Sequence, residues 1–126
     1  MQIGDHLVTP RRGYMHHGIY VGGGMVIHYG GYTKGKADGI IVVTTLDEFA
    51  QGNGYLTVKH WFRRFSALRS VERALSRLGE RRYGLVFNNC ESFVSWCIWG
   101  VRFSSQVSKG MLCLALVAGA LIRVAA

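Results

Sequence analysis

Residues 87–94 are Phe87-Asn88-Asn89-Cys90-Glu91-Ser92-Phe93-Val94, a polar segment followed directly by an apolar one. This order is typical of a helix N-terminus, with Asn89 as the N-cap and Cys90 as the first helical residue. The first turn of a helix carries unpaired backbone N–H groups and the positive end of the macrodipole, and both stabilise a thiolate. We therefore expect Cys90 to have a lowered pKa and to be a reactive nucleophile.

Hydrophobic periodicity predicts two helices in the second half of the chain. Over residues 66–78, apolar side chains recur every three or four positions with arginines on the other side, and Gly79 ends the pattern. The second helix is expected over residues 90–99, with Gly100 as its stop. Its buried stripe is expected to consist of Phe93, Val94, Cys97 and Ile98.

The first sixty residues have the pattern of strands separated by glycines. Strands are predicted over residues 3–9, 16–21, 25–29, 40–45 and 56–62, with a loop over 30–39 and a helical turn over 46–49. The continuous apolar run 40–45 predicts a strand buried on both faces. The order of elements indicates the α+β class, with an antiparallel sheet from the N-terminal half packed against helices 66–78 and 90–99.

Composition limits the function classes. The chain of 126 residues is long enough for one domain with a core, and its formal charge of +8 favours a polyanionic partner such as an anionic membrane surface. Nucleic acid is not expected as a partner, because no recognition motif is visible. The three cysteines show no disulfide framework or metal-ligand spacing, so we expect no cofactor and no metal. The N-terminus has no secretory signal, so we expect a cytoplasmic location and not a secreted protein.

The C-terminal segment differs from the rest of the chain. Residues 110–122 form an uncharged and mostly apolar run of 13 residues, which spans about 20 Å as a helix, against about 30 Å for the hydrocarbon core of a bilayer. A terminal anchor, an interfacial helix and a core helix are all compatible with this run. We favour membrane attachment, so residues 105–126 are expected to be a hydrophobic helix outside a catalytic domain over 1–104.

His16 and His28 flank the predicted hairpin. If Gly22, Gly23 and Gly24 form its loop, Gly18 lies opposite His28 and His16 becomes a diagonal neighbour on the same face. One imidazole can then act as the base for a thiol while the second orients it.

Three further histidines have no such role in the sequence. His17 is expected to point away from His16 by strand alternation, and His6 and His60 are expected to be structural.

Three ordered motifs resemble the lecithin–retinol acyltransferase-like (LRAT) domain. They are His16-His17-Gly18-Ile19-Tyr20-Val21-Gly22, Val26-Ile27-His28 and Asn89-Cys90-Glu91-Ser92-Phe93-Val94. Residues 4–7 are similar to that family's opening strand, and residues 77–80 precede the cysteine as in its bacterial members. The match extends over residues 4–100, and the ordered set is more specific than any one motif.

The resemblance implies a circularly permuted papain-like fold related to the NlpC-type peptidases. It also implies Cys90 as the acyl-accepting nucleophile, His16 as its base and His28 as the polar third member, with Tyr20 as a candidate substrate or oxyanion contact. Two positions depart from the family pattern: His17 stands where an aromatic residue is usual, and Ser92 where histidine is frequent.

The expected function is a membrane-associated thiol acyltransferase or phospholipase A that acts on glycerophospholipid esters through an acyl thioester on Cys90. Two alternatives stay open on the sequence. One is an intracellular cysteine amidase or isopeptidase of NlpC type, and the other is a non-enzymatic membrane-binding module.

Overall fold

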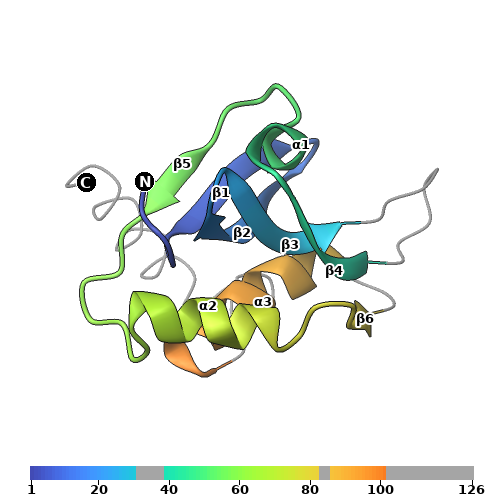
Figure 1. Ribbon diagram of the computed structural model, residues 1–126. Helices are drawn as coiled ribbons and strands as arrows, with labels where there is room; N and C mark the ends of the chain where they lie inside the picture. Colours follow the sequence, from blue (N-terminus) through green and yellow to red (C-terminus); the bar gives the residue numbers. More distant parts are fainter. Residues whose placement is uncertain (31–38, 83–85, 102–126) are drawn as a thin grey trace, which may run out of the picture.

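The computed structural model describes residues 1–30, 39–82 and 86–101, and it confirms the α+β class. Its centre is a six-stranded antiparallel sheet with the strand order β5-β1-β2-β3-β4-β6 (Figure 1). The elements are β1 (His6–Arg11), β2 (Tyr14–Gly22), β3 (Met25–Gly30), β4 (Gly39–Thr45), α1 (Leu46–Ala50), β5 (Leu56–Val58), α2 (Ala67–Leu75), β6 (Arg81–Arg82) and α3 (Val86–Trp99).

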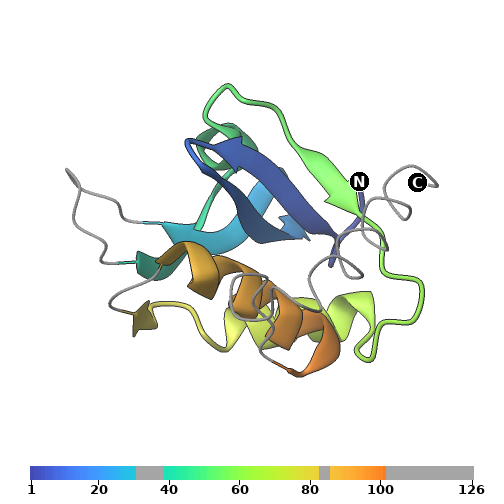
Figure 2. The ribbon, with the colours of Figure 1, turned by 180° about the vertical axis from the view of Figure 1, so that it is seen from behind.

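The helices cover the two faces of the sheet unequally. Seen from behind, α2 and α3 lie together on one side of it, whereas the short helix α1 lies on the other (Figure 2). The α3 face holds the larger apolar cluster, in which Ile19 and Ile27 pack with Cys90 and Phe93. The α1 face holds a smaller cluster of Leu7, Val26 and Phe49. Because successive strand residues point to opposite faces, the central strands β2 and β3 contribute to both clusters.

The β2–β3 hairpin has the predicted pairing at its functional end. Gly18 lies opposite His28, as expected, but the loop differs from the three-glycine loop of the sequence prediction. Gly22 pairs with Met25 around a turn at residues 23 and 24, and the register shifts between Tyr20 and Gly22. This bulge supplies the one extra residue that the predicted odd loop would have supplied, so the two histidines still share a face.

The strand and helix predictions need three corrections. The predicted burial of strand 40–45 on both faces is wrong, because β4 alternates, with Ile41 buried and Val43 39% exposed. Strand β5 ends at Val58 rather than at residue 62. Helix α2 is shorter than the predicted 66–78. Its buried residues are Ser70 and Ala74, whereas three leucines of the predicted stripe are exposed: Leu68, Leu75 and Leu78.

Helix α3 begins one turn earlier than predicted. It starts at Val86, so Asn89 is not its N-cap and Cys90 lies inside the helix. The predicted buried stripe is confirmed, since Phe93, Val94, Cys97 and Ile98 are each at most 1% exposed.

Several sequence predictions lie outside the described residues. They concern most of the loop 30–39, Cys113 and the hydrophobic segment 105–126. Among the described helices, none is long and apolar enough to cross a bilayer.

Candidate active site

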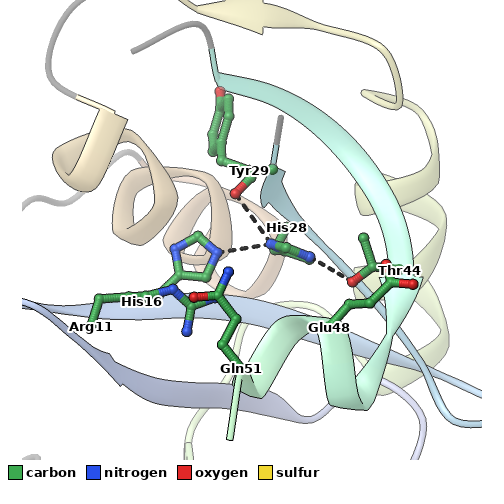
Figure 3. Close-up of a pocket in the computed structure, with 8 residues that line it drawn as sticks. Arg11, His16, His28, Tyr29, Thr44, Glu48 and Gln51 are labelled. Carbon is green, nitrogen blue, oxygen red and sulfur yellow. Dashed lines mark hydrogen bonds between the residues drawn. The ribbon is translucent and has the colours of Figure 1, made fainter. Parts of the chain in front are cut away.

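A pocket of about 220 Å³ opens on the α1 face of the sheet (Figure 3). His16 from β2 and His28 from β3 form its floor, and both rings pack against Phe49 of α1, at 5.5 Å and 5.1 Å between ring centroids. The remaining lining residues come from the ends of neighbouring elements: Arg11, Tyr29, Gly30, Thr44, Glu48 and Gln51. The sequence signalled only the two histidines, and Thr44, Glu48 and Gln51 reach the pocket from segments that are distant from both along the chain.

The structure joins His16 and His28 directly. His16 Nε2 lies 2.8 Å from His28 Nδ1, and His28 Nε2 lies 2.7 Å from Thr44 Oγ1 (Figure 3). Gly18 makes the close approach of the two rings to Phe49 possible, since a Cβ at this position would lie 2.8 Å from the Phe49 ring. Thr44 was not singled out in the sequence, because only the register of β3 with β4 brings it beside His28.

His16, His28 and Thr44 form a hydrogen-bonded chain, and we assign its ring protons from the donors and acceptors around it. The Thr44 hydroxyl donates to the Thr45 carbonyl, 3.1 Å away, so its oxygen accepts from His28 Nε2–H. His28 Nδ1 then accepts from His16 Nε2–H. The Tyr29 carbonyl, 3.1 Å from the same Nδ1, accepts a hydrogen bond only when Nδ1 carries a proton, as it would after His16 passed its Nε2 proton to His28. In this arrangement His16 Nδ1 carries a lone pair, which is the requirement for a base.

Burial keeps both imidazoles neutral. It lowers the pKa of His16 to about 2, with further contributions from His28 and Arg11. It lowers the pKa of His28 to about 4, and the Tyr29 carbonyl offsets part of that effect. Both rings are therefore neutral at pH 7, and burial makes each of them a weaker base than an exposed imidazole.

Cys90 lies on the α3 face, against the backbone of β2. Its Sγ donates toward the Met15 carbonyl at 4.0 Å, and the His17 backbone N–H also bonds to the sulfur. Met15 and His17 are the two neighbours of His16, so the sulfur contacts the strand on both sides of the candidate base. The side chain is fully buried in the apolar cluster of the α3 face. The pocket that the two histidines line is on the other face of the sheet.

The expected lowered pKa of Cys90 is wrong. Burial raises the pKa of its thiol to about 11, and the His17 N–H offsets part of the rise. The sequence argument failed because Cys90 is not at the helix start and packs among apolar side chains. Cys90 is therefore a thiol at neutral pH and needs a base to become a nucleophile.

Tyr20 lies at the far end of the hairpin from the pocket. Its hydroxyl accepts from the Gly24 N–H at 3.0 Å, and its ring packs on the α1-face cluster. The geometry gives Tyr20 a role in holding the β2–β3 turn, and its contact with the substrate stays a prediction.

His17 points away from His16, and it lies on the Cys90 face. There it belongs to a second set of histidines, with His6 2.8 Å away and His60 2.9 Å beyond His6. In the described part of the chain, no group of three or more His, Cys, Asp or Glu side chains is arranged to hold a metal ion.

Known proteins resemble this chain over most of its length. The family model described as Lecithin retinol acyltransferase matches residues 1–103. Phospholipase A and acyltransferase 2 of Homo sapiens is 32% identical over 136 aligned positions, covering 95% of this chain and 84% of the relative. The Lecithin retinol acyltransferases of Homo sapiens and Bos taurus are 34% and 32% identical over 134 positions. These alignments cover 84% of this chain and 58% of each relative, so the chain matches less than two thirds of their length.

Proposed function

Because this chain belongs to the lecithin retinol acyltransferase family, we propose that it is a cysteine-dependent phospholipase A or acyltransferase acting on glycerophospholipid esters. One observation carries the proposal. The sulfur of Cys90 contacts the backbone on both sides of His16, and the ring of His16 ends a neutral hydrogen-bonded chain that leaves Nδ1 as a proton acceptor.

The proposed reaction uses these groups in two steps. The Cys90 sulfur lies on the α3 face and the His16 ring lines the pocket on the α1 face, so the proposed reaction requires the Cys90 side chain to turn past the β2 backbone toward the pocket. There His16 Nδ1 takes the thiol proton of Cys90 as the sulfur forms a bond to the ester carbonyl carbon. The ester C–O bond then breaks, and the lysophospholipid leaves with the proton from His16 Nδ1. Water, an amine or an alcohol attacks the resulting thioester, gives its proton to His16 and restores the Cys90 thiol as the acyl product departs.

His28 orients the base in this scheme. Its Nδ1 accepts from His16 Nε2–H, and Thr44 in turn fixes His28, as in a triad with a histidine in the third position. Burial and the neighbouring His28 both disfavour a positive charge on His16, so the proton that His16 takes is held only transiently before it passes to the leaving group.

Two features support a phospholipid as the substrate. The Arg11 guanidinium lies in the pocket beside the histidines, where it can pair with a phosphodiester. The phospholipase A relative bears a phospholipid activity in its name, and this chain covers 84% of that protein.

We further propose that an anionic membrane surface is the partner, on the cytoplasmic side. Segment 59–65 exposes two aromatic side chains, Trp61 at 65% and Phe62 at 87%. They stand between the exposed cations Lys59 and Arg64, a combination suited to a negatively charged lipid interface. The apolar run 110–122 adds a second candidate for membrane attachment.

The chemistry is tested by trapping the acyl enzyme. Purified protein is incubated with phosphatidylcholine vesicles that carry a labelled acyl chain, and intact-protein mass spectrometry locates the adduct. We expect an acyl adduct on Cys90 of the wild-type protein and no acyl release by Cys90→Ala. The matched control is Cys97→Ala, which also replaces a buried cysteine of α3 and should retain the activity. Turnover of lipid by Cys90→Ala would refute the proposal, and turnover of peptide amides in place of lipid would favour the amidase alternative.

Membrane association is tested by co-sedimentation with vesicles of phosphatidylcholine, with and without 30% phosphatidylserine. Basic residues gain roughly 1 kcal/mol each near an anionic lipid surface. We expect binding to require phosphatidylserine and to weaken in the double variant Trp61→Ser/Phe62→Ser, compared with Tyr55→Ser on another exposed loop. Equal sedimentation of all three proteins would exclude segment 59–65 as the contact.

A further inference from the structure

A second hydrogen-bonded chain runs along the α3 face of the sheet. Trp99 Nε1–H donates to His60 Nδ1 at 3.3 Å. His60 Nε2 lies 2.9 Å from His6 Nδ1, and His6 Nε2 lies 2.8 Å from His17 Nδ1. The chain joins the end of α3 to the segment after β5, then to β1 and finally to β2.

The direction of this chain is fixed by its first member. An indole N–H only donates, so His60 Nδ1 must accept and a neutral His60 carries its proton on Nε2. Burial lowers the pKa of His60 to about 4, which keeps it neutral at pH 7. The same reasoning then places the proton of neutral His6 on Nε2 and that of neutral His17 on Nε2. Each ring is thereby held in one tautomer by the ring before it.

The chain ends beside the candidate nucleophile. The His17 backbone N–H is bonded to the Cys90 sulfur, and the carbonyl of Met15, two residues earlier, accepts from the same sulfur. Cys90 and Trp99 lie nine positions apart on α3, about 14 Å at the helical rise. The histidines therefore connect the far end of the helix to the strand that faces its cysteine.

We propose that Trp99, His60 and His6 form a positioning relay that fixes the ring of His17 and so holds the His17 backbone N–H against the Cys90 sulfur. The relay rests on the proposed role of Cys90 as nucleophile. None of its members lines the pocket, and each acts on Cys90 through His17, so they are positioning residues.

Physical reasoning favours this role over simple packing. His6 and His17 are 8% and 9% exposed, and a buried imidazole needs hydrogen-bond partners that an apolar ring does not. A backbone N–H directed at sulfur favours the thiolate over the thiol, and a strand residue clamped by its ring keeps that N–H aligned. The nearby charges are Glu91, which raises the pKa of Cys90, and Arg63, which lowers that of His60.

The experiment compares the full-length protein with His60→Phe and His60→Gln. Phenylalanine keeps an aromatic ring and removes both hydrogen bonds, whereas the glutamine amide N–H can replace Nε2–H as the donor to His6. For each protein, the rate of iodoacetamide alkylation at Cys90 is followed by peptide mass spectrometry from pH 7 to 10.5, with Cys97 as the internal control. Alkylation needs no lipid, so its result is independent of whether the enzyme is a phospholipase.

We expect His60→Phe to slow alkylation of Cys90 about threefold to tenfold at each pH, which corresponds to a thiolate pKa higher by about half a unit to one unit. His60→Gln should restore most of the rate, and the rate at Cys97 should stay unchanged. Superimposable pH profiles of His60→Phe and wild type, or equal losses in both variants, would overturn the relay.

A second measurement covers the case in which His60→Phe folds poorly. Two-dimensional ¹⁵N–¹H spectra of the histidine rings in the wild-type protein report the protonated nitrogen directly. We expect the Nε2–H tautomer for His6, His17 and His60. An Nδ1–H tautomer at His6 or His60 would overturn the proposed direction of the chain.

Discussion

Two hydrogen-bonded chains of histidines meet at adjacent residues of β2 and run in opposite directions. On the α1 face, His16 donates to His28, and His28 donates to Thr44, so the protons point away from β2. On the α3 face, Trp99 donates to His60 and the protons point toward β2, ending at His17.

The terminal group explains the difference. The Thr44 oxygen accepts because its hydroxyl proton is engaged by the Thr45 carbonyl, whereas an indole N–H can only donate. The first chain therefore leaves a lone pair on His16, and the second leaves a fixed proton on His17. The adjacent histidines His16 and His17 thus differ in role, one as a base and the other as a positioning residue, because their hydrogen-bond partners differ.

The largest expected effect comes from replacing the histidine of β2 in each hydrogen-bonded chain, His16 or His17. His16→Gln should lower kcat for phospholipid hydrolysis by about 10²–10⁴-fold, because it removes the base. His17→Phe, which places an aromatic residue on the other face, should lower it about threefold to tenfold, because the backbone N–H remains. The measurement is kcat on phosphatidylcholine vesicles, with circular dichroism to verify folding.

Equal losses in His16→Gln and His17→Phe would remove the functional distinction between the two chains. A larger loss in His17→Phe would identify His17 as the base in place of His16.

A smaller effect is expected at the end of the first chain. Thr44→Val removes the acceptor of His28 Nε2–H and leaves a buried donor unsatisfied, at a cost of about 1–3 kcal/mol. His28 is then less firmly oriented, and kcat should fall about tenfold. Thr44→Ser retains the hydroxyl and serves as the matched control, so a comparable loss in Thr44→Ser would show that the methyl group and not the hydrogen bond is important.

The smallest expected effect is on the pH dependence of the free energy of unfolding. Histidines of both hydrogen-bonded chains contribute to it. Burial lowers the folded-state pKa of His16 to about 2 and those of His28 and His60 to about 4, against 6.5 for unfolded histidine. Below pH 6.5 the unfolded chain takes up protons that the folded protein does not, so the free energy of unfolding falls with falling pH. Each group contributes a slope of about 1.4 kcal/mol per pH unit within this window.

Urea unfolding between pH 6.5 and 5 measures this slope, in a range where most carboxylates stay ionised. We expect His60→Phe to reduce the slope by about 1.4 kcal/mol per pH unit, the contribution of one proton. An unchanged slope would mean that His60 is protonated in the folded protein, which is incompatible with its place in the second chain.

The fold was largely predictable because its elements follow from local patterns. Glycine turns and apolar runs identify β2, β3 and β4, and the helical period identifies α3 with its buried stripe. The helix boundaries were less predictable: Cys90 was expected at a helix start, and α3 begins at Val86. That error carried over to the pKa of the thiol, since one turn of helix separates a solvated terminus from an apolar core.

The sequence alone determined the α+β class and the opposite orientations of His16 and His17, because alternation along a strand is a property of the backbone. That His16 and His28 share a face was predicted from an odd loop, and in the structure it depends on the bulge between Tyr20 and Gly22. Only the tertiary structure decided what each histidine does. The proton on an imidazole depends on its hydrogen-bond partner, and the partners Thr44, His60 and Trp99 come from elements far from β2 in the chain. The burial that raises the pKa of Cys90 likewise depends on the packing of α3 against the sheet.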